Sequence, residues 1–214
     1  SYTVRDEWGE RAEGAATVSI TVTRRGGRAG FADMSGSVFE GAALRVSDAG
    51  IMGGTEVGGK VYFYPDQTVS RSEFIVMAMT AAGISDLPAC SATVFADDGD
   101  IPASAKPYIG AAYKLGICDG WIKDGKQCFL PDEAVSVAEA AVITAGLLEI
   151  KTDGATAAWC DDGGVPAWAS AGFGTMKAAG FVGTVPASGA RSGLDRRTCA
   201  VLMAAIMRYS AAKK

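Results

Sequence analysis

The stretch FYPDQTVSRSE at residues 63–73 recurs as FLPDEAVSVAE at residues 129–139. Each copy ends in Ser-x-x-Glu, the spacing of a capping box, in which the serine oxygen and the glutamate carboxylate satisfy free amides of a first helical turn. After the first copy, Phe74, Met77 and Ala78 follow with the spacing of one helical face. Each copy therefore predicts a loop or short hairpin that leads into a helix.

Two further landmarks recur in a constant order along the chain. One is an aromatic residue two positions before an aspartate, and the other is a glycine followed by an apolar residue. They begin at Phe31, Phe95 and Trp159, and at Gly50, Gly116 and Gly180, respectively. Because both landmarks recur in the same order and at nearly the same interval, they indicate internal repeats. We predict three units at residues 31–90, 91–154 and 155–214, called units one, two and three below.

Each unit is predicted to form a helix, a loop or short hairpin, and a second helix, so the fold class is mainly α. Ile109, Ala112 and Gly116 lie on one helical face, and the final glycine suits a left-handed cap. Unit three lacks F-x-P-D, but Leu194-Asp195-Arg196-Arg197 stands where its second helix should begin. The other first helices are expected near residues 38–50 and 167–180. One apolar stripe per helix predicts that the units share a core, as a compact pseudo-threefold helical body.

The segment before unit one has a different pattern. Residues 17–23, TVSITVT, alternate polar and apolar side chains, which predicts a strand with one buried face. Residues 1–25 are therefore interpreted as a β-strand remnant of a preceding domain, and residues 26–30 as a linker. Because the chain opens with SYTVRDEWGE rather than a signal peptide, we expect a fragment of a longer protein.

Composition excludes several functional classes. The chain has no histidine, which argues against Ser-His-Asp or Cys-His catalysis. The net charge of −4 disfavours nucleic acid as a partner, and no apolar run is long enough to insert in a membrane.

The acids at 97–100 and 161–163 lack an EF-hand register, so no metal is expected, and their recurrence in the repeats disfavours a glycosidase pair. Cys118 and Cys128 are a possible disulfide pair, and the alternative is that the cysteines are small buried apolar residues.

The repeated motifs resemble those of the S-layer homology family. The resemblance covers about residues 31–210 and rests on Phe-Ala-Asp, Gly-Ile, F-x-P-D and the SRSE stretch at 70–73, which is similar to the family's T-R-A-E motif. It implies a pseudo-threefold prism of three helical units with grooves between neighbours. The residues before unit one resemble the end of an immunoglobulin-like or cadherin-like repeat of bacterial surface proteins.

The resemblance implies an extracellular module that anchors a surface protein to the bacterial wall without covalent bonds. Its expected partner is a secondary cell-wall polysaccharide, often with pyruvate ketals, or a peptidoglycan-linked glycan. It implies no enzymatic activity, and nothing in the sequence predicts a cofactor. The alternative function is a protein-interaction module or host-binding adhesin on the same scaffold, favoured by the eroded motifs of units two and three.

The motif transfers residue by residue onto candidate ligand-binding positions. Unit two has Val137 in place of the arginine, and unit three has Asp195 and Thr198 in place of serine and glutamate. We therefore expect unequal grooves, the best at Arg71 and the worst at Val137. The transferred residues are Ser70, Arg71, Glu73, Ser136, Glu139 and Arg196.

Arg71 lies just inside a capped helix start, where free amides and the helix dipole favour an anion, so it could bind a sugar carboxylate. The alternatives are a solvated surface arginine or an ion pair with an aspartate such as Asp33. The two glutamates could equally serve only as caps. Glycine and aromatic residues of the loops could approach or stack on a sugar, with Trp121 as a candidate platform or a core aromatic. These loop candidates are Gly53, Gly54, Asp119, Gly120 and Trp121.

Overall fold

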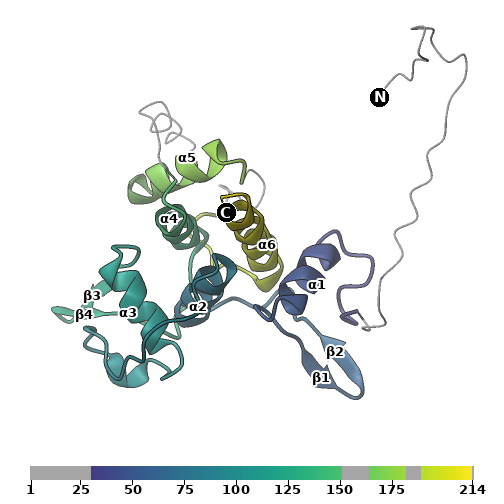
Figure 1. Ribbon diagram of the computed structural model, residues 1–214, viewed down its shortest axis with the longest axis horizontal. Helices are drawn as coiled ribbons and strands as arrows, with labels where there is room; N and C mark the ends of the chain where they lie inside the picture. Colours follow the sequence, from purple (N-terminus) through teal and green to yellow (C-terminus); the bar gives the residue numbers. More distant parts are fainter. Residues whose placement is uncertain (1–29, 151–163, 182–188, 214) are drawn as a thin grey trace, which may run out of the picture.

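The computed structural model describes residues 30–150, 164–181 and 189–213, and this part of the chain is mainly helical, as predicted (Figure 1). The strand predicted at residues 17–23 and the motif at Trp159 lie outside the described residues. The helices and strands are α1 Glu40–Asp48, β1 Thr55–Val57, β2 Lys60–Tyr62, α2 Arg71–Ala81, α3 Lys106–Lys114, β3 Trp121–Lys123, β4 Lys126–Cys128, α4 Val137–Leu147, α5 Ser170–Ala178 and α6 Arg196–Ala212. Short 3-10 helices precede α3 and α5, at Asp98–Asp100 and Ala167–Ala169.

Units one and two each contain a short hairpin between their two helices, which is one of the two predicted forms, a loop or a hairpin. Strands β1 and β2 are antiparallel with Thr55 opposite Tyr62, and β3 and β4 are antiparallel with Trp121 opposite Cys128. Each hairpin turns on two residues with positive φ, Gly58-Gly59 in unit one and Asp124-Gly125 in unit two. Gly-Gly and Asp-Gly are the pairs that such tight turns favour, so local sequence explains both hairpins.

In unit one, the aspartate of the Phe-Ala-Asp motif binds the backbone of the F-x-P-D motif. Its carboxylate, on Asp33, accepts the amides of Phe63 and Tyr64 at 2.8 and 2.7 Å. The aromatic residue of the same motif, Phe31, is buried, and its ring centroid lies 4.9 Å from that of Phe63. Asp33 is therefore a structural acceptor, and the idea that it pairs with Arg71 is wrong.

Unit two repeats this arrangement. The Asp97 carboxylate accepts the amides of Phe129 and Leu130, both at 2.7 Å. Phe95 is buried and packs on Phe129 with 5.4 Å between ring centroids. The Phe-Ala-Asp motif thus holds F-x-P-D in both units, because one side chain supplies core packing and the other satisfies two backbone donors.

At Gly189 unit three also has a residue with positive φ, although the F-x-P-D residues are absent. In units one and two the residue before the proline, Tyr64 or Leu130, has φ of 56° or 59°. Gly189 has φ of 104° and precedes Ala190, whose carbonyl accepts the amide of Ala138. In the same way, the Pro131 carbonyl accepts the amide of Ser72. Glycine adopts positive φ without a side-chain clash, so a different sequence forms a related turn.

The segments that precede α2, α4 and α6 meet in a closed ring of backbone hydrogen bonds. Val69 donates to Leu194, Leu194 donates to Val135, and Val135 donates to Val69, with N···O distances of 2.9, 2.8 and 3.0 Å. The first helical amides also donate to a neighbouring unit, for example Arg71 to Glu133 and Arg196 to Gln67, both at 2.9 Å. Donors that a helix start leaves free are thus satisfied between units.

The hydrophobic core is continuous across the three predicted units. Phe74 of α2, Ile109 of α3 and Ile206 of α6 belong to one buried cluster. Helix α6 packs on α1 and α2, and α4 packs on α5 (Figure 1). Among the described helices, none combines the length and the apolar character needed to cross a membrane.

The proposed Cys118–Cys128 disulfide is wrong for this structure. Both thiols are free, as are those of Cys90 and Cys199. The hairpin register explains this, because Cys128 pairs with Trp121 across the strands, which leaves Cys118 beyond the end of the ladder. The alternative, that all the cysteines are buried, holds for Cys118, Cys128 and Cys199, whereas Cys90 is partly exposed and Cys160 lies outside the described residues. Burial raises the pKa of the Cys118 thiol to about 11.

Candidate functional site

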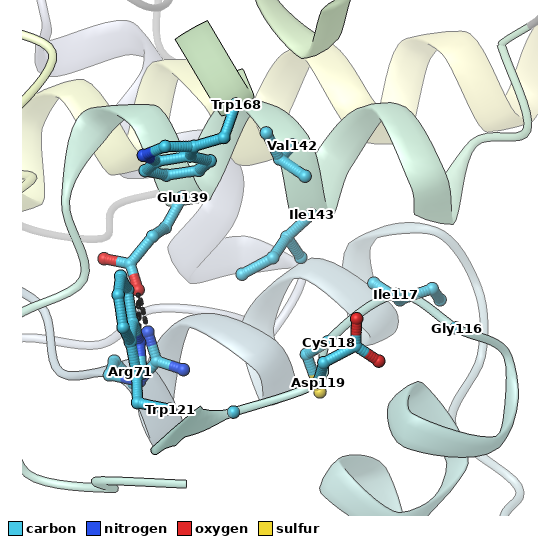
Figure 2. Close-up of a pocket in the computed structure, with 11 residues that line it drawn as sticks. Arg71, Gly116, Ile117, Cys118, Asp119, Trp121, Glu139, Val142, Ile143 and Trp168 are labelled. Atoms are coloured by element: carbon cyan, nitrogen blue, oxygen red, sulfur yellow. Dashed lines mark hydrogen bonds and ion pairs between the residues drawn. The ribbon is translucent and has the colours of Figure 1, made fainter. Parts of the chain in front are cut away.

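A groove of about 350 Å³ lies where the three predicted units meet (Figure 2). Arg71 of α2 comes from unit one, the loop from Gly116 to Trp121 and helix α4 come from unit two, and Trp168 comes from unit three. Its apolar lining includes Ile117, Val142 and Ile143. The groove therefore depends on contacts between units.

Arg71 is a buried residue with defined partners. It is only 6% exposed, and its Nε donates to the carbonyl of Phe129 at 2.8 Å. Its Nη1 forms an ion pair with Glu139, and its guanidinium lies 5.2 Å from the Phe129 ring centroid and 5.9 Å from that of Trp121. Burial lowers the pKa of Arg71 from its ordinary value. Arg71 is thus neither a solvated surface arginine nor a partner of Asp33, since it joins units one and two.

Glu139 combines the two roles between which sequence alone could not decide. Its Oε2 accepts the Ser136 amide at 2.8 Å and completes a capping box. Its Oε1 binds Arg71 and accepts the Trp121 indole N–H at 3.2 Å. The carboxylate therefore caps α4 and also holds two other groove residues in place.

Two indoles are exposed at the groove. Trp121 is 47% exposed and Trp168 is 53% exposed, so Trp121 is a surface residue rather than a core one, and its role as a stacking platform stays a prediction. Figure 2 shows Trp168 on the opposite side of the Glu139 carboxylate from Trp121. Sequence reasoning missed Trp168, because no aromatic residue recurs at its position. The available signal was a tryptophan at the start of the predicted helix 167–180.

Two of the three predicted loop glycines, Gly54 and Gly120, pack closely against aromatic rings, whereas a Cβ on Gly53 would meet no atom within 4 Å. A Cβ on Gly54 would lie 2.7 Å from the ring of Phe31, and one on Gly120 would lie 2.6 Å from the ring of Phe95. Gly120 also has φ of +73°. These two glycines let the hairpins approach the repeated aromatic residues.

A second groove, of about 300 Å³, repeats the construction at Arg196. The Arg196 Nε donates to the Phe63 carbonyl at 2.8 Å, and the guanidinium lies 4.7 Å from the Phe63 ring centroid. Its Nη2 donates to the carbonyl of Gly53 at 2.6 Å. Glu73 and Ser104 also line this groove. The repeat places Ser104 at the position of Trp168 and Gly53 at that of Asp119, so the second groove lacks those side chains.

The candidate residues thus fall into separate sets. The first groove brings together Arg71, Asp119, Gly120, Trp121 and Glu139, and the second brings together Gly53, Glu73 and Arg196.

The remaining candidates have structural positions. Ser70 and Ser136 cap α2 and α4 through their hydroxyls, as predicted, and Gly54 packs on Phe31. Val137 is buried, and the expectation that its groove is the weakest stays a prediction, because residues 182–188 lie outside the described residues.

Comparison with known protein families supports the class suggested by this fold of short helical units and hairpins. The family model of the S-layer homology domain matches residues 30–75, which hold the Phe-Ala-Asp, Gly-Ile, F-x-P-D and SRSE motifs of unit one. A comparison with curated proteins finds no match.

Residues 30–75 therefore match the S-layer homology family. Domains of this family anchor bacterial surface proteins to the cell wall and bind cell-wall glycans, and the family is not catalytic. A match to this family indicates a protein associated with the bacterial cell surface.

Proposed function

We propose that the chain anchors its parent protein by binding a secondary cell-wall polysaccharide, chiefly in the groove at Arg71. The observation that carries this proposal is the pair of exposed indoles beside the Arg71–Glu139 ion pair. Sugar rings stack their apolar C–H faces on aromatic rings, while their hydroxyls need donors and acceptors. The groove offers both kinds of surface within one cavity.

We also propose that units one, two and three are successive S-layer homology repeats arranged as a pseudo-threefold prism. The cyclic hydrogen bonds among Val69, Val135 and Leu194 support this arrangement, because each unit donates to one neighbour and accepts from the other. The parallel environments of Arg71 and Arg196 support it further. A groove would then form at each junction, with side chains that differ from one junction to the next.

The groove at Arg71 is the favoured site because it alone, of the two described grooves that contain an arginine, has two lining tryptophans. We expect Trp168→Ala to weaken binding to wall polysaccharide from the source organism about tenfold, through loss of a stacking surface. The measurement is co-sedimentation with purified wall polymer, together with circular dichroism to verify the fold.

The matched control is Ile122→Ala. Ile122 is 74% exposed and next to Trp121 in β3, but it does not line the groove. We expect this variant to bind as well as the parent. Equal binding by Trp168→Ala and the parent chain would contradict the proposal that this groove holds the polymer.

A further inference from the structure

The charges that line the groove at Arg71 do not favour an anion. Arg71 is the positive residue of its lining, and Glu139 and Asp119 are negative. The arginine already uses Nε on a carbonyl and Nη1 on the Glu139 carboxylate. Among the described residues no partner is found for Nη2 of Arg71, so an acidic sugar could reach only this part of the guanidinium and would also approach the carboxylates of Glu139 and Asp119. A pyruvate carboxylate would thus meet two acidic side chains for one guanidinium.

Asp119 supplies a carboxylate that the structure does not use for folding. In the part of the chain that the structure describes, no hydrogen bond or ion pair to its side chain is found, and the residue is exposed. Figure 2 shows the carboxylate beside Ile117, turned away from Arg71 and Trp121. Unit one forms the equivalent loop with Gly53, which shows that the fold does not require an acid there.

The aromatic lining favours the same kind of ligand. The faces of Trp121 and Trp168 carry the negative part of the ring quadrupole, which attracts cations. Carboxylate and indole together are a combination that recognises an ammonium group. The Arg71–Glu139 pair remains suited to sugar hydroxyls, because an ion-paired site presents both donors and acceptors without excess positive charge.

We propose that this groove selects a sugar that carries a free ammonium group, that is, a hexosamine residue without its N-acetyl group, with Asp119 as the specificity-determining residue. The inference rests on the proposed function, since it names the kind of sugar held in the same groove. The groove at Arg196 lacks this selectivity, because Gly53 and Ser104 occupy the positions of Asp119 and Trp168.

The test compares three samples of wall polysaccharide from the source organism: untreated, N-acetylated with acetic anhydride, and freed of pyruvate ketals by mild acid. N-acetylation converts each ammonium group to a neutral amide, and we expect it to weaken binding about tenfold through loss of a charge-assisted hydrogen bond. Removal of ketals should leave binding unchanged. Failure to bind the untreated polymer would refute the anchoring function itself.

Two variants assign the effect to a residue. Asp119→Asn should weaken binding to the untreated polymer about tenfold and should remove the difference between untreated and N-acetylated samples. The control is Asp124→Asn, which makes the same charge change at an exposed hairpin turn with φ of 50°, a conformation that asparagine tolerates. Binding that is insensitive to N-acetylation, or that is lost with the ketals, would overturn the inference while leaving wall binding intact.

Discussion

Arg71 connects folding to binding at the scale of a single residue. Its Nε and Nη1 join it to Phe129 and Glu139 across the junction between units one and two, and its ring contacts include Trp121. A substitution there removes a groove residue and a structural contact together. Loss of binding in an Arg71 variant therefore does not by itself identify a ligand contact, whereas Trp168 and Asp119 report on the groove more directly.

Arg71→Ala is expected to lower the free energy of unfolding by about 3 kcal/mol, because it leaves the largely buried Glu139 carboxylate without its cation. The control is Arg197→Ala, which removes the more exposed pairs with Asp66 and Asp195 and should cost about 1 kcal/mol or less. Urea unfolding followed by circular dichroism measures both. Similar losses for the two variants would mean that burial does not strengthen the Arg71 contact.

Two glycines of the β3–β4 hairpin show how tertiary packing limits which residues the hairpin can contain. Gly120 directly precedes β3, and Gly125 lies in the turn between β3 and β4. Both have φ of +73°. A Cβ on Gly125 would meet no atom within 4 Å, whereas one on Gly120 would press on Phe95 and on the carbonyl of Cys128. The two positions thus differ in packing while sharing one backbone conformation.

Gly125→Ala should cost about 1 kcal/mol from the left-handed conformation alone, and Gly120→Ala should cost at least about 2 kcal/mol more because of the added clash. Thermal unfolding monitored by circular dichroism compares the two. Equal melting temperatures would show that the hairpin can move away from Phe95 at little cost.

Local sequence was sufficient to predict the helices and the starts of α2 and α4. The capping boxes at Ser70 and Ser136 and the helix face around Ile109 all follow from short-range spacing, and the structure has them. Sequence did not predict the turn at Gly189, because a glycine there reproduces a backbone conformation without the F-x-P-D residues. It also failed on the disulfide, since strand register, rather than separation along the chain, determines which residues face Cys128.

The site was harder to predict than the fold, because its residues come from three separate units. Arg71, Asp119 and Trp121 follow from motifs and loop composition, but the pairing of Arg71 with Glu139 depends on how α2 and α4 are placed. Trp168 has no aromatic counterpart in the other units, so periodicity could not reveal it. Differences between repeats, rather than their shared motifs, set the chemistry of each groove.

At the scale of the whole molecule, the grooves at Arg71 and Arg196 have the same backbone arrangement and differ in their side chains. Both arginines contact the phenylalanine of a neighbouring F-x-P-D motif through Nε and the ring face. Asp119 and Trp168 are replaced at the second groove by Gly53 and Ser104. We therefore assign the shared backbone arrangement to folding and the differing side chains to selective binding of the wall polymer.

The most direct test of this assignment is calorimetric titration of the chain with a short, purified wall oligosaccharide, for the parent and for Trp121→Ala/Trp168→Ala. We expect one strong site per parent chain and no strong site in the double variant, whose circular dichroism should match that of the parent. Two or more equal sites per parent chain, or an unchanged strong site in the folded double variant, would contradict the claim that the groove at Arg71 is the principal wall-binding site.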